Sequence, residues 1–383
     1  MATNTSVIGG GAKMRARRIA IIAPSIRSVM QLRKSVLSKL LDADHVVLVV
    51  VPQLDAETQA RLDAMGVLHA VFTPATSRIK AYADYKNIQA LAAILSDFGA
   101  DTALCYGAKM MVRGALSAKK ASVDHIVTMV TGLPTHRFTG AVAAGDDSSG
   151  SYTRAFRASH EIIFHNHDDL RHLQVLGILP EDAKSSVLPG AGVDLDHNAV
   201  LELPQLANGL VFLMIARLEA GKGVKAYCAA AKEMKARAPQ AKFLLAGPAG
   251  QGDDGVGPEL WQSEASNVAY LGPLTDVREE IANCHVFVYP SRAEGMPRLV
   301  LEAMAAGRPI ITCDVAGCRE TVDERVNGVL VAPGDVEDLV SAIESFLKRP
   351  DLIPSMARAS RSKAERRFDQ TRADAQLLAA LAV

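Results

Sequence analysis

The chain has 383 residues, of which 49% are hydrophobic and 22% are charged, as in a globular protein large enough for two domains. Its formal net charge is zero, which gives no reason to expect a nucleic-acid partner. The charge is uneven, because residues 1–41 contain eight Lys or Arg residues and no acidic residue. The five cysteines lack the spacing of metal ligands, so we expect buried thiols in a reducing compartment.

The N-terminal segment and the longest apolar run both argue against a chain that crosses a membrane. Residues 203–216 form the longest uncharged apolar run, and this run is too short to span a bilayer. No apolar core of a signal peptide precedes the first predicted strand, and residues 1–17 are predicted to form a flexible tail. We therefore expect a cytoplasmic protein whose membrane contact, if any, is peripheral, on the cytoplasmic face of the inner membrane.

Short apolar runs alternate with helical patterns along the first half of the chain. The predicted strands are 18–23, 45–51, 69–72, 102–106, 125–130 and 161–164. The predicted helices are 26–41, 56–65, 82–98 and 113–121. This alternation predicts an α/β fold with a doubly wound parallel sheet. Ligands bind such sheets beyond the carboxyl ends of the strands, which places residues 24–25, 107–109 and 131–132 on one rim.

Three polar features of the first half have more than one interpretation. Arg33 interrupts the apolar face of the first helix and either covers apolar surface with its stem or points into a cleft. Residues 138–151 are rich in Gly, Ala, Ser and Asp and predict a mobile loop on the rim. The segment His165-Asn166-His167-Asp168-Asp169 could suggest a metal site, but we favour a loop whose Asp caps the next helix.

The second half shows the same alternation. The predicted strands are 210–216, 243–246, 268–271, 286–289 and 309–313. The predicted helices are 224–235, 297–306, 337–347 and 355–381. A second parallel α/β sheet therefore follows the first, and residues 187–196 form the junction between them.

Residues 285–321 form a strand, loop, helix and strand that carry the strongest chemical signal. Pro297 suits a first helical residue, where its missing N–H would have no partner anyway. The N-terminus of this helix suits a phosphate, so Glu294 at the same place is predicted to face sugar hydroxyls instead. Glu302, with Arg298 four residues before it on the same helix face, could hold a ribose. The alternative is that both glutamates are solvated helix charges.

Glu294 and Glu302, with the Ala-Met-Ala-Ala-Gly-Arg-Pro-Ile-Ile that follows, resemble the signature of family-four retaining glycosyltransferases. The continuation at residues 314–322 resembles the branch that builds bacterial capsular, O-antigen and other surface polysaccharides. The resemblance implies a GT-B fold, in which two Rossmann-like domains face a cleft and the second holds most of the nucleotide sugar. The implied divisions are a tail 1–17, an acceptor-side domain 18–190, a linker 191–208, a nucleotide-sugar domain 209–353, and C-terminal helices 354–383 that cross back to the first domain.

Arg217 and Lys222-Gly223, after the strand 210–216, resemble the family segment in which two cations meet the donor diphosphate. A departing nucleoside diphosphate gains negative charge, which fixed cations stabilise. Without the glutamates downstream, two surface cations in a turn would be the simpler interpretation. The resemblance therefore implies catalysis by Glu294, Arg217 and Lys222, with no metal ion and no cofactor beyond the nucleotide sugar.

The resemblance also implies a set of substrate-binding residues. They are Gly295, Met296, Pro297, Arg298, Leu299, Glu302, Gly247, Pro273, Leu274, Thr131, Gly132 and Arg33. Many relatives have a histidine immediately before the glycine at the position of Thr131. Either Thr131 supplies a hydroxyl contact, or His136 reaches in from the next loop, or the acceptor side is specialised.

These observations predict a retaining glycosyltransferase. It is expected to move a hexose or N-acetylhexosamine from a UDP-sugar to a lipid-linked or growing saccharide in surface polysaccharide synthesis. An epimerase of the same fold, or a catalytically silent binding subunit, is the alternative. Basic residues along the first domain also predict contact with an anionic membrane surface. They are Arg15, Arg17, Arg18, Arg27, Arg33, Lys34, Lys39, Lys109, Arg113, Lys119 and Lys120.

Overall fold

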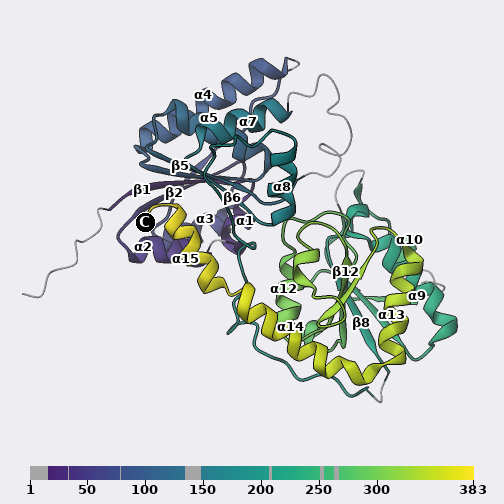
Figure 1. Cartoon of the computed structure of the whole chain (residues 1–383). Helices are drawn as coiled ribbons and strands as arrows, with labels where there is room; N and C mark the ends of the chain where they lie inside the picture. The colour runs from purple at the N-terminus through teal and green to yellow at the C-terminus, as the bar shows by residue number, and fades with distance from the viewer. Residues whose placement is uncertain are drawn as a thin grey trace, which may run out of the picture.

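Two parallel sheets, each covered by helices, make two domains that lie side by side in the computed structural model (Figure 1). The structure describes residues 16–32, 34–77, 79–133, 148–206, 209–250, 254–262 and 267–383. None of the helices in this described part of the chain combines the length and the apolar character that crossing a bilayer requires.

The first sheet has seven strands in the order β3-β2-β1-β4-β5-β6-β7, and every neighbouring pair is parallel. The strands are β1 (Arg18–Ile22), β2 (Val46–Val51), β3 (Leu68–Val71), β4 (Thr102–Tyr106), β5 (His125–Val130), β6 (Glu161–Phe164) and β7 (Ser185–Val187). The central strand β4 is buried at every residue. Continuous apolar runs suit such strands because helices cover both faces of a parallel sheet.

The helices of the first domain lie on both faces of this sheet. They are α1 (Ile26–Leu32), α2 (Lys34–Asp42), α3 (Ala56–Met65), α4 (Lys80–Phe98), α5 (Ala108–Lys120), α7 (Ser148–Ala158) and α8 (His167–Val175). One apolar core joins the sheet to α2 and α3, and another joins it to α4 and α5 on the opposite face (Figure 1). The sheet class was therefore predicted correctly, although the single helix expected over 26–41 is assigned as α1 and α2.

The second sheet has six parallel strands in the order β10-β9-β8-β11-β12-β13. They are β8 (Val211–Ile215), β9 (Lys242–Ala246), β10 (Val268–Tyr270), β11 (Val286–Tyr289), β12 (Ile310–Cys313) and β13 (Gly328–Val331). The helices after β8 are α9 (Val224–Arg237), α10 (Glu259–Gln262), α11 (Arg278–Ala282), α12 (Arg298–Ala305), α13 (Val336–Lys348), α14 (Ile353–Arg367) and α15 (Gln370–Ala380). Short 3₁₀ turns are η2 (Ala220–Lys222), η4 (Arg319–Thr321) and η5 (Pro350–Leu352).

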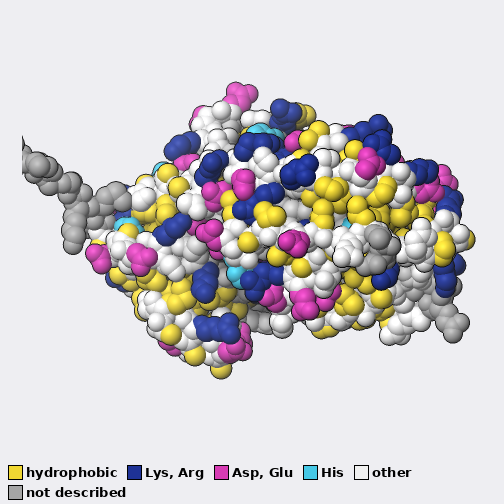
Figure 2. Space-filling view, turned by 90° about the horizontal axis from the view of Figure 1, so that it is seen from below, with side chains coloured by type: hydrophobic (Ala, Val, Ile, Leu, Met, Phe, Trp, Pro, Cys, Tyr) yellow, Lys and Arg dark blue, Asp and Glu magenta, His cyan; other side chains and the backbone are white. Residues whose placement is uncertain are grey.

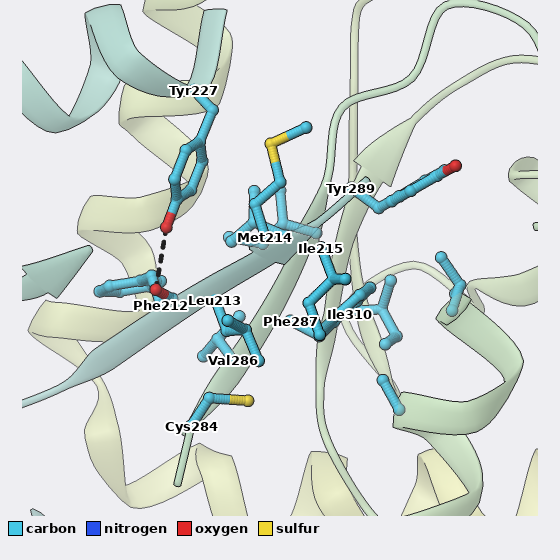
Figure 3. Packing of buried hydrophobic residues seen from close by; sticks show 14 of the residues in the cluster. Phe212, Leu213, Met214, Ile215, Tyr227, Cys284, Val286, Phe287, Tyr289 and Ile310 are labelled. Carbon is cyan, nitrogen blue, oxygen red and sulfur yellow. Dashed lines mark hydrogen bonds between the residues drawn. The ribbon is translucent and has the colours of Figure 1, made fainter. Parts of the chain in front are cut away.

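Aromatic packing fixes the centre of the second sheet. Phe212 on β8 stacks on Phe243 of β9 with ring centroids 5.3 Å apart, and the Tyr227 hydroxyl donates to the Phe212 carbonyl at 2.9 Å (Figure 3). Tyr289, at the end of β11, extends away from this cluster and carries its hydroxyl outward (Figure 3). The Tyr289 hydroxyl therefore lies at the carboxyl edge of the second sheet.

The last two helices join the domains, because α14 packs on α12 and α15 packs on α2 (Figure 1). Lys39 pairs with Asp374 at 2.7 Å, and the Ala380 carbonyl lies 2.8 Å from His125 Nε2. One helix was predicted over 355–381, but the chain turns at residues 368–369. Phe368 is buried in the second core, and Asp369 accepts a hydrogen bond from the Thr371 N–H to start α15.

The surface mixes charges of both signs. On the face seen from below, Lys and Arg side chains lie among Asp and Glu side chains, with apolar areas between them (Figure 2). All five cysteines are buried free thiols, as predicted. Burial raises the pKa of the Cys228 thiol to about 11, so this group is not a nucleophile near neutral pH.

Candidate active site between the two domains

The loops that follow β8 and β11 lie against each other at the carboxyl edge of the second sheet, because these two strands are neighbours. Gly223 has φ +79°, and a Cβ atom there would lie 2.0 Å from the Pro290 carbonyl oxygen. Only glycine allows this approach. The close contact brings Lys222, on the first loop, to Glu294 on the second.

Glu294 is held by three donors that all reach the same carboxyl oxygen, Oε1. Lys222 Nζ lies 2.5 Å from it, the Tyr289 hydroxyl 2.7 Å and the Ser291 hydroxyl 2.8 Å. The side chains of Lys222 and Glu294 are only 19% and 13% exposed, so the ion pair is shielded from water. No hydrogen bond from the described part of the chain reaches Oε2, which leaves that oxygen for a ligand hydroxyl.

Tyr289 is suited to donate this hydrogen bond at any ordinary pH. Burial raises the pKa of its phenol well above the usual value, and the neighbouring Glu294 carboxyl raises it further. The phenol therefore keeps its proton. Neither Tyr289 nor Ser291 was predicted as a site residue from the sequence, although both lie within five residues of Glu294.

Arg217 follows β8 as predicted, but it points to a different partner. Its guanidinium pairs with Glu219 at 2.6 Å, and its side chain is 60% exposed. The structure thus brings Lys222 and Glu294 together and leaves Arg217 at the edge of the same loop. The Glu219 side chain is 16% exposed, so only the Arg217 end of this pair is open to solvent.

Glu302 lies one turn into α12 and is buried, with 6% of its surface exposed. Arg298 Nε donates to its Oε1 at 2.7 Å, as the helical spacing predicted. Burial raises the pKa of the Glu302 carboxyl, and Arg298 opposes this rise. The interpretation of Glu302 as a solvated helix charge is therefore wrong. Pro297 is the N-cap residue of α12 with ψ 101°, so the helix begins at Arg298, one position after the first helical residue that we predicted.

The loops after β9 and β10 form the next part of the same edge. The Gly247 N–H donates to the Gly272 carbonyl at 2.9 Å, and a Cβ at Gly247 would lie 1.8 Å from the Ala216 carbonyl oxygen. Pro273 is exposed, and Leu274 is half-buried against the second core. Gly247, Pro273 and Leu274 therefore lie at the carboxyl edge of the second sheet, next to the loop after β8 that contains Arg217.

Gly295 and Met296 lie between the domains, at the start of the predicted segment 295–299. Thr131 and Gly132 contribute main chain here, because a Cβ at Gly295 would lie 1.7 Å from the Thr131 carbonyl oxygen and one at Gly132 would lie 2.9 Å from the Gly295 nitrogen. Met296 touches Gly190 in the junction, where a Cβ would lie 2.8 Å from Met296 Cγ. Leu299 packs against the second core.

Two predicted candidates fall outside the residues that the structure describes. These are Arg33 and His136, together with most of the loop predicted over 138–151. Asn166, and not the aspartate that we predicted, caps α8. Its side chain also donates to the Gly295 carbonyl at 2.9 Å across the domain boundary.

The acid and base groups of the site do not gather as metal ligands. Within the described ranges, no three His, Cys, Asp or Glu side chains come together as a set that could hold a metal ion. Positive groups at the rim include Lys222, Arg217 and the N-terminus of α12. Together with the carboxyl of Glu294, they form a place where an anion and a polyol could lie side by side.

Known proteins are similar to this chain in sequence. Residues 209–349 match the family described as glycosyl transferases group 1. The chain is 27% identical to the N,N'-diacetylbacillosaminyl-diphospho-undecaprenol alpha-1,3-N-acetylgalactosaminyltransferase of Campylobacter jejuni, over 89% of this chain and 92% of that protein. It is 25% identical to the UDP-Gal:alpha-D-GlcNAc-diphosphoundecaprenol alpha-1,3-galactosyltransferase of Escherichia coli, over 72% and 74% of the two chains.

Solved structures share the two-domain arrangement. The Anabaena protein HepE, in complex with UDP and glucose, superposes with a TM-score of 0.74 at 18% identity, covering 96% of this chain and 100% of that one. A glycosyltransferase from Rickettsia africae superposes with a TM-score of 0.75 at 17% identity, covering 96% and 98%. The predicted GT-B fold is confirmed, and so is the resemblance on which it rested.

Proposed function

We propose that the chain moves a sugar from a nucleotide donor to a lipid-linked or growing saccharide with retention at the anomeric carbon, on the premise that residues 209–349 match the family described as glycosyl transferases group 1. The observation that carries the proposal is the contact of Lys222 with Glu294 at 2.5 Å in the rim between the domains. Lys222 can bind a diphosphate, Glu294 can bind sugar hydroxyls, and the two side chains are in direct contact. In a nucleotide sugar, the diphosphate and the sugar hydroxyls likewise lie next to each other.

In this proposal the second domain holds the donor. Lys222 exchanges its partner from Glu294 to the diphosphate, Arg217 leaves Glu219 to join it, and the N-terminus of α12 adds its free N–H groups. Glu294 stays attached to Tyr289 and Ser291 and offers Oε2 to the sugar. These cations stabilise the charge that develops on the leaving group.

The bond changes balance without a covalent intermediate. The bond from the anomeric carbon to the phosphate oxygen breaks, and the acceptor oxygen attacks from the same face. The acceptor's proton passes to the departing phosphate oxygen, and a nucleoside diphosphate leaves. In this proposal Glu294 Oε2 binds a sugar hydroxyl while Tyr289 and Ser291 hold Oε1, and Lys222 binds the diphosphate, so neither side chain is assigned the attack on the anomeric carbon.

Glu302 is proposed to bind the donor ribose, with the loops at Gly247, Pro273 and Leu274 beside the base. A buried carboxyl held by Arg298 can accept hydroxyl hydrogen bonds at a fixed position. The E. coli relative is named for UDP-Gal, and the HepE structure contains UDP, which supports a UDP-sugar here.

The acceptor is proposed to approach from the first domain, at the rim made by Thr131 and Gly132. The C. jejuni and E. coli relatives are both named for sugars on diphospho-undecaprenol, and one is named for N-acetylgalactosamine and the other for galactose. We therefore propose a polyprenyl-diphosphate saccharide as the acceptor and a hexose or N-acetylhexosamine as the transferred sugar, in surface polysaccharide synthesis.

A lipid-linked acceptor requires the rim to meet a membrane, and we propose that the first turns of α4 and α5 make that peripheral contact. Both helices begin at the carboxyl edge of the first sheet. Tyr82 and Tyr85 are 51% and 60% exposed, and Lys109 is exposed at the start of α5. Exposed aromatic and basic side chains suit an anionic lipid interface. Lys119 and Lys120 lie at the far end of α5 and serve as a control.

The membrane contact is tested by flotation with vesicles that contain anionic phospholipid, at low and high salt. Wild type is expected to float at low salt, Lys109→Glu to float less, and Lys119→Glu to behave like wild type. Each basic residue near the surface is worth about 1 kcal/mol, or roughly five-fold in binding. Equal flotation of the two variants, or none by wild type, would refute this surface.

The transfer itself is tested by incubating the intact protein with a panel of nucleotide sugars and a polyprenyl-diphosphate saccharide. We expect release of the nucleoside diphosphate that depends on the acceptor, and a product whose new linkage is α by NMR. A β-linked product would refute retention, and epimerisation without an acceptor would refute transfer.

Metal independence belongs to the same proposal, because Lys222 and Arg217 supply the charge that a divalent cation supplies elsewhere. Turnover is expected to be unchanged after exhaustive chelation. Loss of turnover in chelator, restored by Mg²⁺ or Mn²⁺, would show that the two cations do not suffice.

A further inference from the structure

The side-chain amide of Asn166 makes three hydrogen bonds. It follows β6 and is fully buried. Its Oδ1 accepts from the Asp169 N–H at 2.7 Å, which caps α8. Its Nδ2 donates to Asp169 Oδ2 and to the Gly295 carbonyl, both at 2.9 Å. Helix capping requires only Oδ1. The hydrogen bond from Nδ2 to Gly295 is therefore a second role of this side chain, in the contact between the domains.

The residue that Asn166 contacts is the immediate neighbour of Glu294. Gly295 has no room for a side chain, since a Cβ would lie 1.7 Å from the Thr131 carbonyl oxygen. On its other side, a Cβ at Gly317 would lie 2.3 Å from the Gly295 carbonyl oxygen. The main chain at Gly295 is therefore held between the first domain and the loop after β12.

A second group of contacts keeps the start of α8 at this boundary. Glu320 Oε1 accepts from the His167 N–H at 2.8 Å, and Arg319 pairs with Asp168 at 2.5 Å. Arg319 and Asp168 are 46% and 37% exposed, so that pair contributes little on its own. Asn166 differs because it is buried, and loss of its donor would leave the Gly295 carbonyl without this partner in a dry contact.

We propose that Asn166 is a positioning residue that couples closure of the two domains to the placement of Glu294. The hydrogen bond to Gly295 exists only when the first domain lies against the second. When it forms, it fixes the main chain next to the carboxyl group that faces the donor sugar. This inference rests on the proposed transferase function for its kinetic consequence, but its structural part does not.

The test separates the two roles of the side chain. Asn166→Ser keeps an oxygen that caps a helix about as well as asparagine, but its short side chain cannot reach Gly295. We expect kcat to fall about 10- to 100-fold, because small misplacement of a catalytic group has costs of this size. The donor KM is expected to change less than about two-fold, since the proposed donor contacts lie within the second domain.

The matched control removes a cap that has no interdomain contact. Asp55 caps α3 through a 2.8 Å hydrogen bond from the Thr58 N–H, and it follows β2, which three strands separate from β6 in the first sheet. Asp55→Ala is expected to lower the melting temperature and leave kcat unchanged. Amide hydrogen exchange over residues 293–297 supplies a readout without turnover, and it should speed up in Asn166→Ser but not in Asp55→Ala.

The outcomes distinguish this inference from the proposed function. If wild type turns over its donor and Asn166→Ser matches it in kcat and in exchange, Asn166 is only a cap and the inference is wrong. The inference is also wrong if the loss of kcat equals the loss of folded protein at the assay temperature. If wild type transfers no sugar but exchange over 293–297 rises in Asn166→Ser, the coupling stands and the transferase proposal fails.

Discussion

The two rims that face each other across the domain boundary are built from different parts of the chain. The rim of the second domain presents charged and hydroxyl side chains that bind one another, with Lys222, Tyr289 and Ser291 around Glu294. The rim of the first domain presents main chain at Thr131 and Gly132, with the buried amide of Asn166 beside them. The charged cluster around Glu294 is therefore complete within one domain, whereas the contacts of the first rim with Gly295 form only when the domains meet.

The difference follows from sheet topology. β8 and β11 are neighbours in the second sheet, so the loops after them meet whatever the first domain does. Thr131, Gly132 and Asn166 follow β5 and β6, which are neighbours in the other sheet, and they reach Gly295 only through domain packing. Changes in the second rim should therefore alter chemistry or donor binding, and changes in the first should alter closure.

The largest effect is expected from Glu294→Gln, which changes the centre of the second rim. The amide keeps an oxygen for Tyr289 and Ser291 but loses the charge that faces the sugar. Loss of one stabilising contact to a developing charge costs about 10²–10³ in turnover, so kcat should fall by this factor with a modest change in KM. Glu233→Gln, at an exposed pair on α9, is the control and should keep wild-type kcat.

Wild-type turnover in Glu294→Gln would place the sugar elsewhere and make the contacts of Glu294 structural. Circular dichroism and a melting curve must first show both variants folded. A drop in kcat shared by Glu233→Gln would likewise remove the contrast between the rim and the rest of the second domain.

A smaller effect is expected from Glu302→Gln, and on a different constant. A hydrogen bond to a charged group is worth about 1.5–3 kcal/mol, so the donor KM should rise roughly 10- to 100-fold while kcat stays near wild type. Arg298→Gln tests whether the 2.7 Å pair places the carboxyl, and it should raise KM less than Glu302→Gln does. A fall in kcat without a change in KM would assign Glu302 to the reacting sugar instead.

Tyr289→Phe should have a milder effect, because two of the three donors to Glu294 stay in place. Loss of one such hydrogen bond costs roughly 1 kcal/mol, or about five-fold in kcat. Since the pKa of the phenol is raised, the wild-type pH profile should show no loss of activity from Tyr289 ionisation below its usual range. A Tyr289→Phe enzyme with unchanged kcat would mean that Lys222 and Ser291 suffice to hold the carboxyl.

The sequence predicted the fold well because parallel strands buried on both faces are continuous apolar runs. It also identified Lys222, Glu294 and Glu302 through a motif that contains the charged residues themselves. It did not predict that Lys222 touches Glu294, because the two are 72 residues apart and meet through strand order. The contact of Asn166 with Gly295 was not predicted for the same reason, since Gly295 lies 129 residues away and contributes a main-chain carbonyl.

Local boundaries were the other source of error. Asn166 and Asp169 are both good N-cap residues, and the pattern could not tell which side chain would cap α8. Residues 355–381 keep helical spacing across the turn at 368–369, so the break before α15 leaves no gap in the apolar pattern. Pro297 differs from its predicted position by one residue, which is the usual uncertainty at a helix end.

The smallest expected effect concerns a feature that the two domains share. His45 precedes β2 and His285 precedes β11, and each accepts a main-chain N–H at Nδ1, from Arg17 and from Val211 respectively, both at 3.0 Å. A protonated ring cannot accept this hydrogen bond. Burial lowers the pKa of both histidines below the ordinary value of 6.5.

Because the folded pKa values are lowered, the unfolded chain binds protons first as the pH falls. The stability from these histidines is complete above pH 6.5 and is lost as the pH falls through the folded pKa values. Glu302 and Asp169, whose pKa values burial raises, act in the opposite direction, so a variant is needed to isolate the effect. Urea unfolding at pH 7.5 and 5.5 should show a smaller loss of unfolding free energy in His285→Gln than in wild type. An equal or larger loss in the variant would mean that the β11 histidine does not titrate on unfolding, and that the two domains differ in this feature as well.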